Sequence, residues 1–197
     1  MKKSKKKKSK FRYADNGERL GTYDGHQGSV WTCDVNWDSS KLATGGADFS
    51  VRLWDVETGN QTSVIDDKNG GLTATAKSVN FSYCGNLIGK LLFCSILKLK
   101  LKKKVFPSGA EMKQTPAINI FDIRVPPGQG AVRQRSLPKD KYDNSIPVKT
   151  LWGFLDEYII TGNDNGHLYV WDANNLDELY RNEKAHKGAI HDMQVKL

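Results

Sequence analysis

Hydrophobic and polar residues alternate along several short runs of this chain, a period of two that is typical of β-strands with one buried face. One run places Val51 and Leu53 on the face opposite to Arg52 and Trp54, and Gly45-Gly46 supplies turn residues before it. The pattern over this region predicts one antiparallel sheet of four strands, which we expect at residues 30–36, 41–45, 51–55 and 60–65.

Four side chains of this expected sheet stand where they can form one hydrogen-bonded chain. His26 precedes the first strand, and Thr44 lies on the second strand. Asp48 lies in the turn that follows, and Trp54 lies on the third strand. A buried imidazole, hydroxyl, carboxylate and indole N–H each need a partner, and these four groups can satisfy one another. This set of residues between such strands is typical of the WD repeat, the four-stranded blade of a β-propeller.

A second blade of the same kind is expected near the C-terminus, with strands at residues 148–152, 158–161, 167–172 and 178–181. Thr161 and Trp171 stand ten positions apart, as the Thr and Trp of the first blade do. Asn165 takes the place of the Asp, and the His is missing, with Asp143 or Asn144 nearest to its position. We therefore expect a partial polar set of Thr161, Asn165 and Trp171 in this blade.

An irregular blade is expected between these two, with an inner strand at 75–81 and a closing strand at 118–122. The closing aromatic residues of the three blades fall at positions 54, 121 and 171, spacings of 67 and 50 residues, whereas a blade takes ~40–45 residues. We assign the roughly 20 extra residues to a Lys-rich insert at 90–112. Either the insert extends an edge strand, since Leu and Lys alternate in it, or it is foreign sequence such as a translated intron. A long exposed loop, rich in Pro and Gly, is expected at 125–142.

These segments predict an all-β fold for residues 16–197. They comprise one outer strand at 18–23, about three blades, and the first strand of a further repeat at 190–197. Closed propellers have ~4–8 blades, and each blade buries its faces only against its neighbours. We therefore expect a partial WD-repeat β-propeller with about three blades plus one strand at each end. It is either a fragment of a seven-bladed propeller or the product of a truncated gene.

The net charge of +8 is unevenly distributed along the chain. Residues 1–12 carry seven Lys and one Arg, residues 90–104 carry six Lys, and neither stretch has an acidic residue; without these fourteen charges the net charge would be −6. Residues 1–15 are expected to form a disordered Lys-rich leader, because residues 1–10 cannot bury apolar surface. The leader is either a solvated tail or an electrostatic arm for RNA or the ribosome, and it also has the composition of a nuclear-localisation signal.

Enzyme and metal signatures are missing from the sequence. It contains no nucleophile elbow, phosphate-binding loop, zinc-protease motif, dinucleotide fingerprint or Cys-x-x-Cys pair. Ser29, His26 and Asp48 could be combined into a catalytic set, but the polar network of the blade already uses the His and the Asp. His186 and His191 lack further ligands at metal spacing. We therefore expect no catalytic, metal-binding or cofactor-binding residues, no enzymatic activity and no membrane span.

Residues 16–60 resemble the start of the WD-repeat "i" subunit of eukaryotic translation initiation factor 3, and shorter similarities lie at Phe81–Ile88, Phe121–Arg124 and Ala185–Asp192. The sequence departs from that family in its Lys-rich leader, its insert at 90–112 and its lack of the later repeats. The resemblance implies a cytoplasmic, non-catalytic scaffold that helps to assemble the initiation complex on the small ribosomal subunit. It implies the "b" and "g" subunits as partners, with nonspecific RNA contact through the Lys runs as an additional expectation.

The WD-repeat pattern by itself also fits other scaffold proteins. The alternative function is that of another WD-repeat adaptor, either receptor-kinase-associated or acting in the assembly of RNA-processing complexes. Residues 18–23 and Asn60 favour the initiation-factor subunit over this alternative. No motif marks a partner-binding surface, so no partner-binding residues are assigned.

Overall fold

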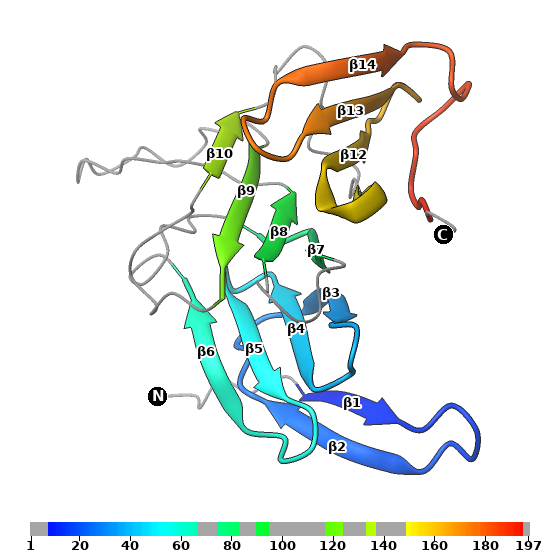
Figure 1. Ribbon diagram of the computed structural model, residues 1–197. Helices are drawn as coiled ribbons and strands as arrows, with labels where there is room; N and C mark the ends of the chain where they lie inside the picture. The colour runs from blue at the N-terminus through cyan, green and yellow to red at the C-terminus, as the bar shows by residue number, and fades with distance from the viewer. Residues whose placement is uncertain are drawn as a thin grey trace, which may run out of the picture.

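The computed structural model describes residues 8–66, 75–82, 90–94, 117–123, 133–136 and 149–194. These residues form fourteen β-strands and one short 3₁₀ helix, and every strand pair is antiparallel. Three sheets have four strands each and one has two (Figure 1). The all-β class expected from the sequence is confirmed. Within the described ranges, no helix has the length and apolar character needed to cross a membrane.

The first four-stranded sheet lies within one residue of the strands expected from the alternating pattern. It comprises β3 (Val30–Val35), β4 (Lys41–Gly46), β5 (Val51–Asp55) and β6 (Gln61–Ile65) in that spatial order. In its central pair Ala43 lies opposite Leu53, and Leu42 lies opposite Trp54. All four side chains are buried, so both faces of this sheet are covered.

The C-terminal sheet also follows the expected strands closely. It comprises β11 (Thr150–Trp152), β12 (Tyr158–Gly162), β13 (Leu168–Asp172) and β14 (Glu178–Asn182). The 3₁₀ helix η1 (Phe154–Asp156) connects β11 to β12. After β14 the structure differs from the expectation, because residues 190–194 form no strand. Ile190 is buried there and its backbone N–H donates to the carbonyl of Asn163 at 3.1 Å, so this segment packs on the turn of its own sheet.

The middle sheet corrects two expectations. It comprises β7 (Ser78–Phe81), β8 (Lys90–Cys94), β9 (Ala117–Asp122) and β10 (Arg133–Ser136). β8 therefore takes the first residues of the expected insert, and the remainder of 90–112 lies outside the described residues. β10 lies within the expected loop at 125–142. The sequence of β10 is polar, and as the outermost strand it pairs with β9 alone. It therefore has no alternation of hydrophobic and polar residues from which a strand could be predicted.

The N-terminus holds a two-stranded ribbon in place of the single outer strand and disordered leader that we expected. β1 (Lys8–Arg12) pairs with β2 (Arg19–Asp24). Phe11 makes this possible, because its ring lies edge-on to the buried ring of Tyr23 with 6.2 Å between the centroids. One aromatic residue thus anchors part of a Lys-rich stretch whose composition alone favours disorder. Residues 1–7 lie outside the described residues.

The three four-stranded sheets follow one another in Figure 1, from the sheet of β3–β6 through the sheet of β7–β10 to the sheet that contains β12–β14. Their first strands are neighbours, β7 lying against β3 and β11 against β7. The N–H of Val79 donates to Thr32 Oγ1 at 3.2 Å, and the N–H of Phe81 donates to Asp34 Oδ2 at 2.7 Å, which joins β7 to β3. The N–H of Thr150 on β11 donates to Ser78 Oγ on β7 at 3.2 Å. Side-by-side first strands with the other strands extending outward are the arrangement of propeller blades.

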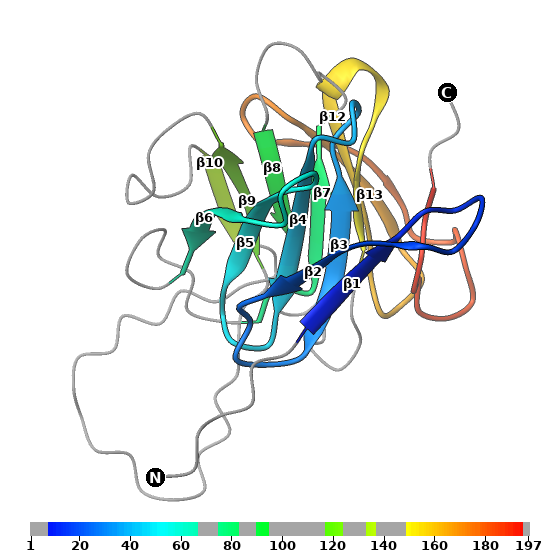
Figure 2. The ribbon, with the colours of Figure 1, turned by 90° about the horizontal axis from the view of Figure 1, so that it is seen from below.

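Apolar clusters fill the spaces between neighbouring sheets. One cluster joins the first sheet to the middle sheet through residues such as Leu53, Val79 and Phe121. A second joins the middle sheet to the C-terminal sheet through Ile118 and Trp171, among others. A third lies between the first sheet and the β1–β2 ribbon, which crosses beside that sheet in Figure 2. The fold is therefore that of a partial WD-repeat propeller, in which each sheet is held by its neighbour.

Candidate functional site

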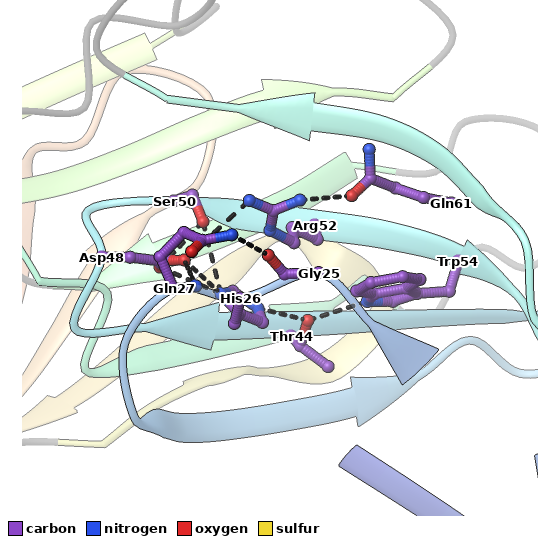
Figure 3. A network of polar contacts seen from close by, with 9 residues as sticks. All are labelled: Gly25, His26, Gln27, Thr44, Asp48, Ser50, Arg52, Trp54 and Gln61. Carbon is purple, nitrogen blue, oxygen red and sulfur yellow. Dashed lines mark hydrogen bonds and ion pairs between the residues drawn. The ribbon is translucent and has the colours of Figure 1, made fainter. Parts of the chain in front are cut away.

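The four side chains selected from the first blade lie together in the structure (Figure 3). His26 sits in the connection between β2 and β3, Thr44 on β4, Asp48 in the β4–β5 turn and Trp54 on β5. The Nε2 atom of His26 lies 2.8 Å from Thr44 Oγ1, and its Nδ1 atom lies 2.9 Å from Asp48 Oδ1. The indole N–H of Trp54 donates to Thr44 Oγ1 at 2.8 Å. The structure thus brings all four residues into one continuous network.

The hydrogen bonds of this network can be assigned one consistent order of donors and acceptors. Thr44 Oγ1 accepts from the indole of Trp54, so its own hydroxyl hydrogen is available for the Nε2 atom of His26. The imidazole then carries its hydrogen on Nδ1 and donates it to the carboxylate of Asp48. With this assignment each buried polar group has a partner, as a buried polar chain requires.

Asp48 is the anionic end of the network. Besides His26, its carboxylate accepts from the backbone N–H of Gln27 at 2.8 Å and from Ser50 Oγ at 2.8 Å, and the guanidinium of Arg52 lies 3.9 Å away. Burial by itself raises the pKa of this carboxyl. The hydrogen bonds from His26, Gln27 and Ser50 outweigh burial and hold the pKa of Asp48 well below its ordinary value.

Ser50 and Gln27 belong to this network although the sequence reasoning did not select them. Ser50 is buried and stands two residues after Asp48, close enough for a local side-chain hydrogen bond. An Asp-x-Ser spacing within a turn was the available signal. The network also requires a glycine at position 46, because a Cβ there would lie 2.7 Å from both Asp48 Oδ1 and His26 Nδ1.

The direction of hydrogen bonding resembles that of a serine-hydrolase triad, in which a hydroxyl donates to a His that donates to an Asp. The hydroxyl here cannot be offered to a substrate, because Thr44 has an exposed fraction of 0% and already accepts from Trp54. Ser29, the nucleophile of the catalytic set considered above, is exposed, and none of its described contacts reaches His26. The geometry therefore suits a structural network and offers no activated nucleophile.

The C-terminal sheet brings together two of its three selected residues. The indole N–H of Trp171 donates to Thr161 Oγ1 at 2.9 Å, as in the first sheet. Asn165 instead lies exposed at the tip of the β12–β13 turn. Its backbone N–H and that of His167 both donate to Asn163 Oδ1, at 3.0 and 2.7 Å, so Asn163 organises this turn. The sequence positions nearest to the missing His, 143 and 144, lie outside the described residues.

An open cavity of about 670 Å³, here called the inner groove, lies along the first strands of the three sheets. Its charged lining residues are mixed in sign, namely Asp34, Lys77, Lys149 and Asp192. Lys149 and Asp192 form an ion pair. Burial raises the pKa of Asp34, against the opposing effects of backbone N–H groups and of Lys149. A mixed and internally paired set of charges does not select a ligand of one sign.

The thiol of Cys33, which also lines the inner groove, has a raised pKa because burial and then the charge of Asp34 disfavour the thiolate. Across the part of the chain that the structure describes, no three His, Cys, Asp or Glu residues are grouped so as to hold a metal ion.

Large aromatic side chains are exposed near the inner groove. Trp31 on β3 is 56% exposed and Trp37, just after β3, is 69% exposed. Exposed aromatic residues of this size are enriched in surfaces that bind other proteins. The rings of Trp31 and Trp37 are accessible to another protein, whereas the buried side chains of His26, Thr44 and Trp54 are not.

Comparison with known proteins gives two results. Residues 17–55 match the family model "WD domain, G-beta repeat". Nearly the whole chain is similar to proteins named "Eukaryotic translation initiation factor 3 subunit I": 36% identical over 192 residues to that of Drosophila willistoni, 35% to that of Drosophila ananassae and 34% to that of Drosophila melanogaster. The alignments cover 98% of this chain and 52–53% of the relatives, so the chain spans about half of their length. The resemblance seen in the sequence is thereby confirmed.

Proposed function

We propose that this chain acts in translation initiation as a non-catalytic scaffold, as a WD-repeat subunit of eukaryotic translation initiation factor 3. The similarity of 34–36% over 98% of the chain carries the proposal. WD repeats occur in many unrelated scaffold proteins. A similarity confined to residues 17–55 would therefore not distinguish one of these functions from another. The similarity extends far beyond that repeat, and it therefore favours the initiation-factor subunit over another WD-repeat adaptor.

The non-catalytic role is supported by the placement of the polar groups. The imidazole, the carboxylate and both hydroxyls of the first-sheet network are turned toward one another inside the blade. Large aromatic rings are exposed at the surface, among them those of Trp31 and Trp37. This distribution suits a protein that binds other proteins and performs no chemistry.

We infer that the partners are the "b" and "g" subunits of initiation factor 3, with the small ribosomal subunit as the site of assembly in the cytoplasm. The support is the resemblance to subunit I over nearly the whole chain. The exposed aromatic surface supplies contact area of the kind that anchors protein interfaces.

Recovery of partners from a eukaryotic cell lysate by the tagged full chain, with mass spectrometry of the bound proteins, tests the proposal. We expect the "b" and "g" subunits with the wild-type chain and with Glu57→Ala, a control in an exposed turn. Trp54→Ala, which removes a buried ring of the first sheet, should reduce their recovery. Recovery of receptor-kinase or spliceosomal proteins without any initiation-factor subunit would overturn the proposal.

A further inference from the structure

The β1–β2 ribbon exposes basic side chains along one edge of the molecule. β1 is the free edge of a two-stranded sheet, and its sequence Lys-Ser-Lys-Phe-Arg alternates basic residues with others. Lys10 and Arg12 on β1 are exposed, and so is Arg19 on β2. These three described residues are here called the basic edge.

Packing of the ribbon explains why the basic edge faces solvent. Phe11 is partly buried and packs against the apolar cluster that includes Tyr23 and Trp54. Successive side chains of a strand point to opposite faces, so the residue before Phe11 points away from the sheet. Lys10 and Arg12, on either side of Phe11 along β1, are accordingly both exposed, and the extra residue of the bulge lies on β2.

The charges of the basic edge have no ion-pair partner among the residues that the structure describes. In the register of the ribbon Arg12 lies directly opposite Arg19, and like charges in that relation repel. None of the ion pairs that the structure describes involves Lys10, Arg12 or Arg19. The guanidinium of Arg12 has only the carbonyl of Gly17 as a described partner, at 2.8 Å. The chain immediately before the ribbon adds Lys residues and no acidic residue.

We propose that the basic edge binds the phosphate backbone of single-stranded RNA. Alternate residues of a strand are about 7 Å apart, which is comparable to the separation of successive phosphates in an extended single strand. Tyr13 follows β1 directly and is 50% exposed, so one base can stack on its ring. The site has no donor and acceptor pattern for reading bases, and it therefore binds RNA without sequence preference.

An anionic membrane surface would also attract these charges, but the ribbon favours RNA. Stable adsorption to a membrane needs an apolar face that enters the lipid as well as basic residues. The apolar side chain of β1, Phe11, is turned toward the protein. The proposal does not depend on the proposed function, because its argument uses only the charge and geometry of the ribbon.

Fluorescence anisotropy of a labelled 20-nucleotide polyuridine with the full chain tests this site. The variant Lys10→Glu/Arg12→Glu/Arg19→Glu is expected to raise the Kd at least about tenfold and to lower the salt slope of log K by about 2, the value for three phosphate contacts. A matched control reverses three exposed Lys residues elsewhere, and so changes the net charge equally, at positions Lys41, Lys184 and Lys187. The control should change the Kd less than about threefold.

Further variants separate loss of the RNA site from loss of folding and from loss of base stacking. If the charge reversal prevents folding, judged by far-UV circular dichroism, Lys10→Gln/Arg12→Gln/Arg19→Gln replaces it and should weaken binding in the same direction. Tyr13→Leu should weaken binding several-fold at an unchanged salt slope, since it removes stacking and no charge. An equal loss in the control variant would overturn the site. So would unchanged RNA binding in the basic-edge variant together with lost binding to vesicles of phosphatidylcholine and phosphatidylserine.

Discussion

The hydroxyl of Thr44 is the centre of the first-sheet network, and its removal gives the sharpest test of that network. Thr44→Val replaces Oγ1 by a methyl group and keeps the shape of the side chain. Two buried groups then lose their partner, namely the indole N–H of Trp54 and the Nε2 atom of His26. Both residues have an exposed fraction of 1%, so water cannot take the place of the hydroxyl.

The magnitude follows from the number of groups left unpaired. Each buried polar group without a partner costs ~1–3 kcal/mol, so Thr44→Val should lower the free energy of unfolding by ~2–6 kcal/mol. That is a large share of the ~5–15 kcal/mol that stabilises a typical domain. The same substitution at an exposed position should change the stability by less than ~0.5 kcal/mol.

Urea titration followed by far-UV circular dichroism measures this difference, with Thr62→Val as the control. Thr62 lies on β6 and is exposed, so it supplies the same chemical change without a buried partner. A second readout is the indole N–H signal of Trp54 in a nitrogen-15 spectrum, whose exchange with solvent should accelerate in Thr44→Val. Equal stability of the two variants, with an unchanged indole signal, would refute the reasoning.

Three other predictions concern the same sheet, and thermal unfolding measures each of them. Trp54→Ala should lower the stability by ~3–5 kcal/mol, because a buried ring leaves a cavity, whereas the exposed Trp37→Ala should stay within ~0.5 kcal/mol. The lowered pKa of Asp48 contributes stability that is present above its unfolded-state pKa of ~4 and is lost as the pH falls toward the lower folded-state value. Asp48→Asn should therefore flatten the decline of Tm below about pH 4, and an unchanged decline would contradict this assignment. Gly46→Ala should destabilise by ~1–3 kcal/mol, since the new Cβ would lie 2.7 Å from Asp48 Oδ1 and His26 Nδ1; a Tm equal to wild type would contradict it.

Strands with several buried apolar side chains were predictable from the sequence, and polar strands at the edge of a sheet were not. β5 buries Val51 and Leu53 on one face and the ring of Trp54 on the other, and it was expected at its observed bounds. β10 reads Arg-Gln-Arg-Ser, its pairing to β9 uses main-chain groups that any residue supplies, and Arg135 contacts Asp177 and the ring of Trp171 through its guanidinium. β1 depends on one ring, that of Phe11, against a leader whose charge favours disorder.

The polar residues were predictable in sequence position but not always in orientation. Spacing placed Asn165 where the first sheet has Asp48, yet the carboxylate of Asp48 faces inward and Asn165 is exposed. The backbone of the two turns is alike, because the N–H of Gly46 donates to the carbonyl of Ser50, the N–H of Asn163 donates to that of His167, and Phe49 and Gly166 both have a positive φ. The side chains around them differ. Asn163 stands at the position of Gly46, and its Oδ1 accepts the N–H groups of Asn165 and His167. Residue counting gives no information on which side chain accepts the N–H groups of a turn.

The first-sheet network also determines where the basic edge lies. The connection from β2 to β3 is held by His26 and by the N–H of Gln27, which donates to Asp48. The adjacent Tyr23 places its ring 5.7 Å from that of Trp54 and donates its hydroxyl to the carbonyl of Val56 at 3.0 Å. β2 is thereby fixed on the face of the first sheet, and β1 is fixed through its pairing with β2. The buried side chains of the first-sheet network thus orient the β1–β2 ribbon, and the charged groups of Lys10, Arg12 and Arg19 on that ribbon remain exposed to a polyanion.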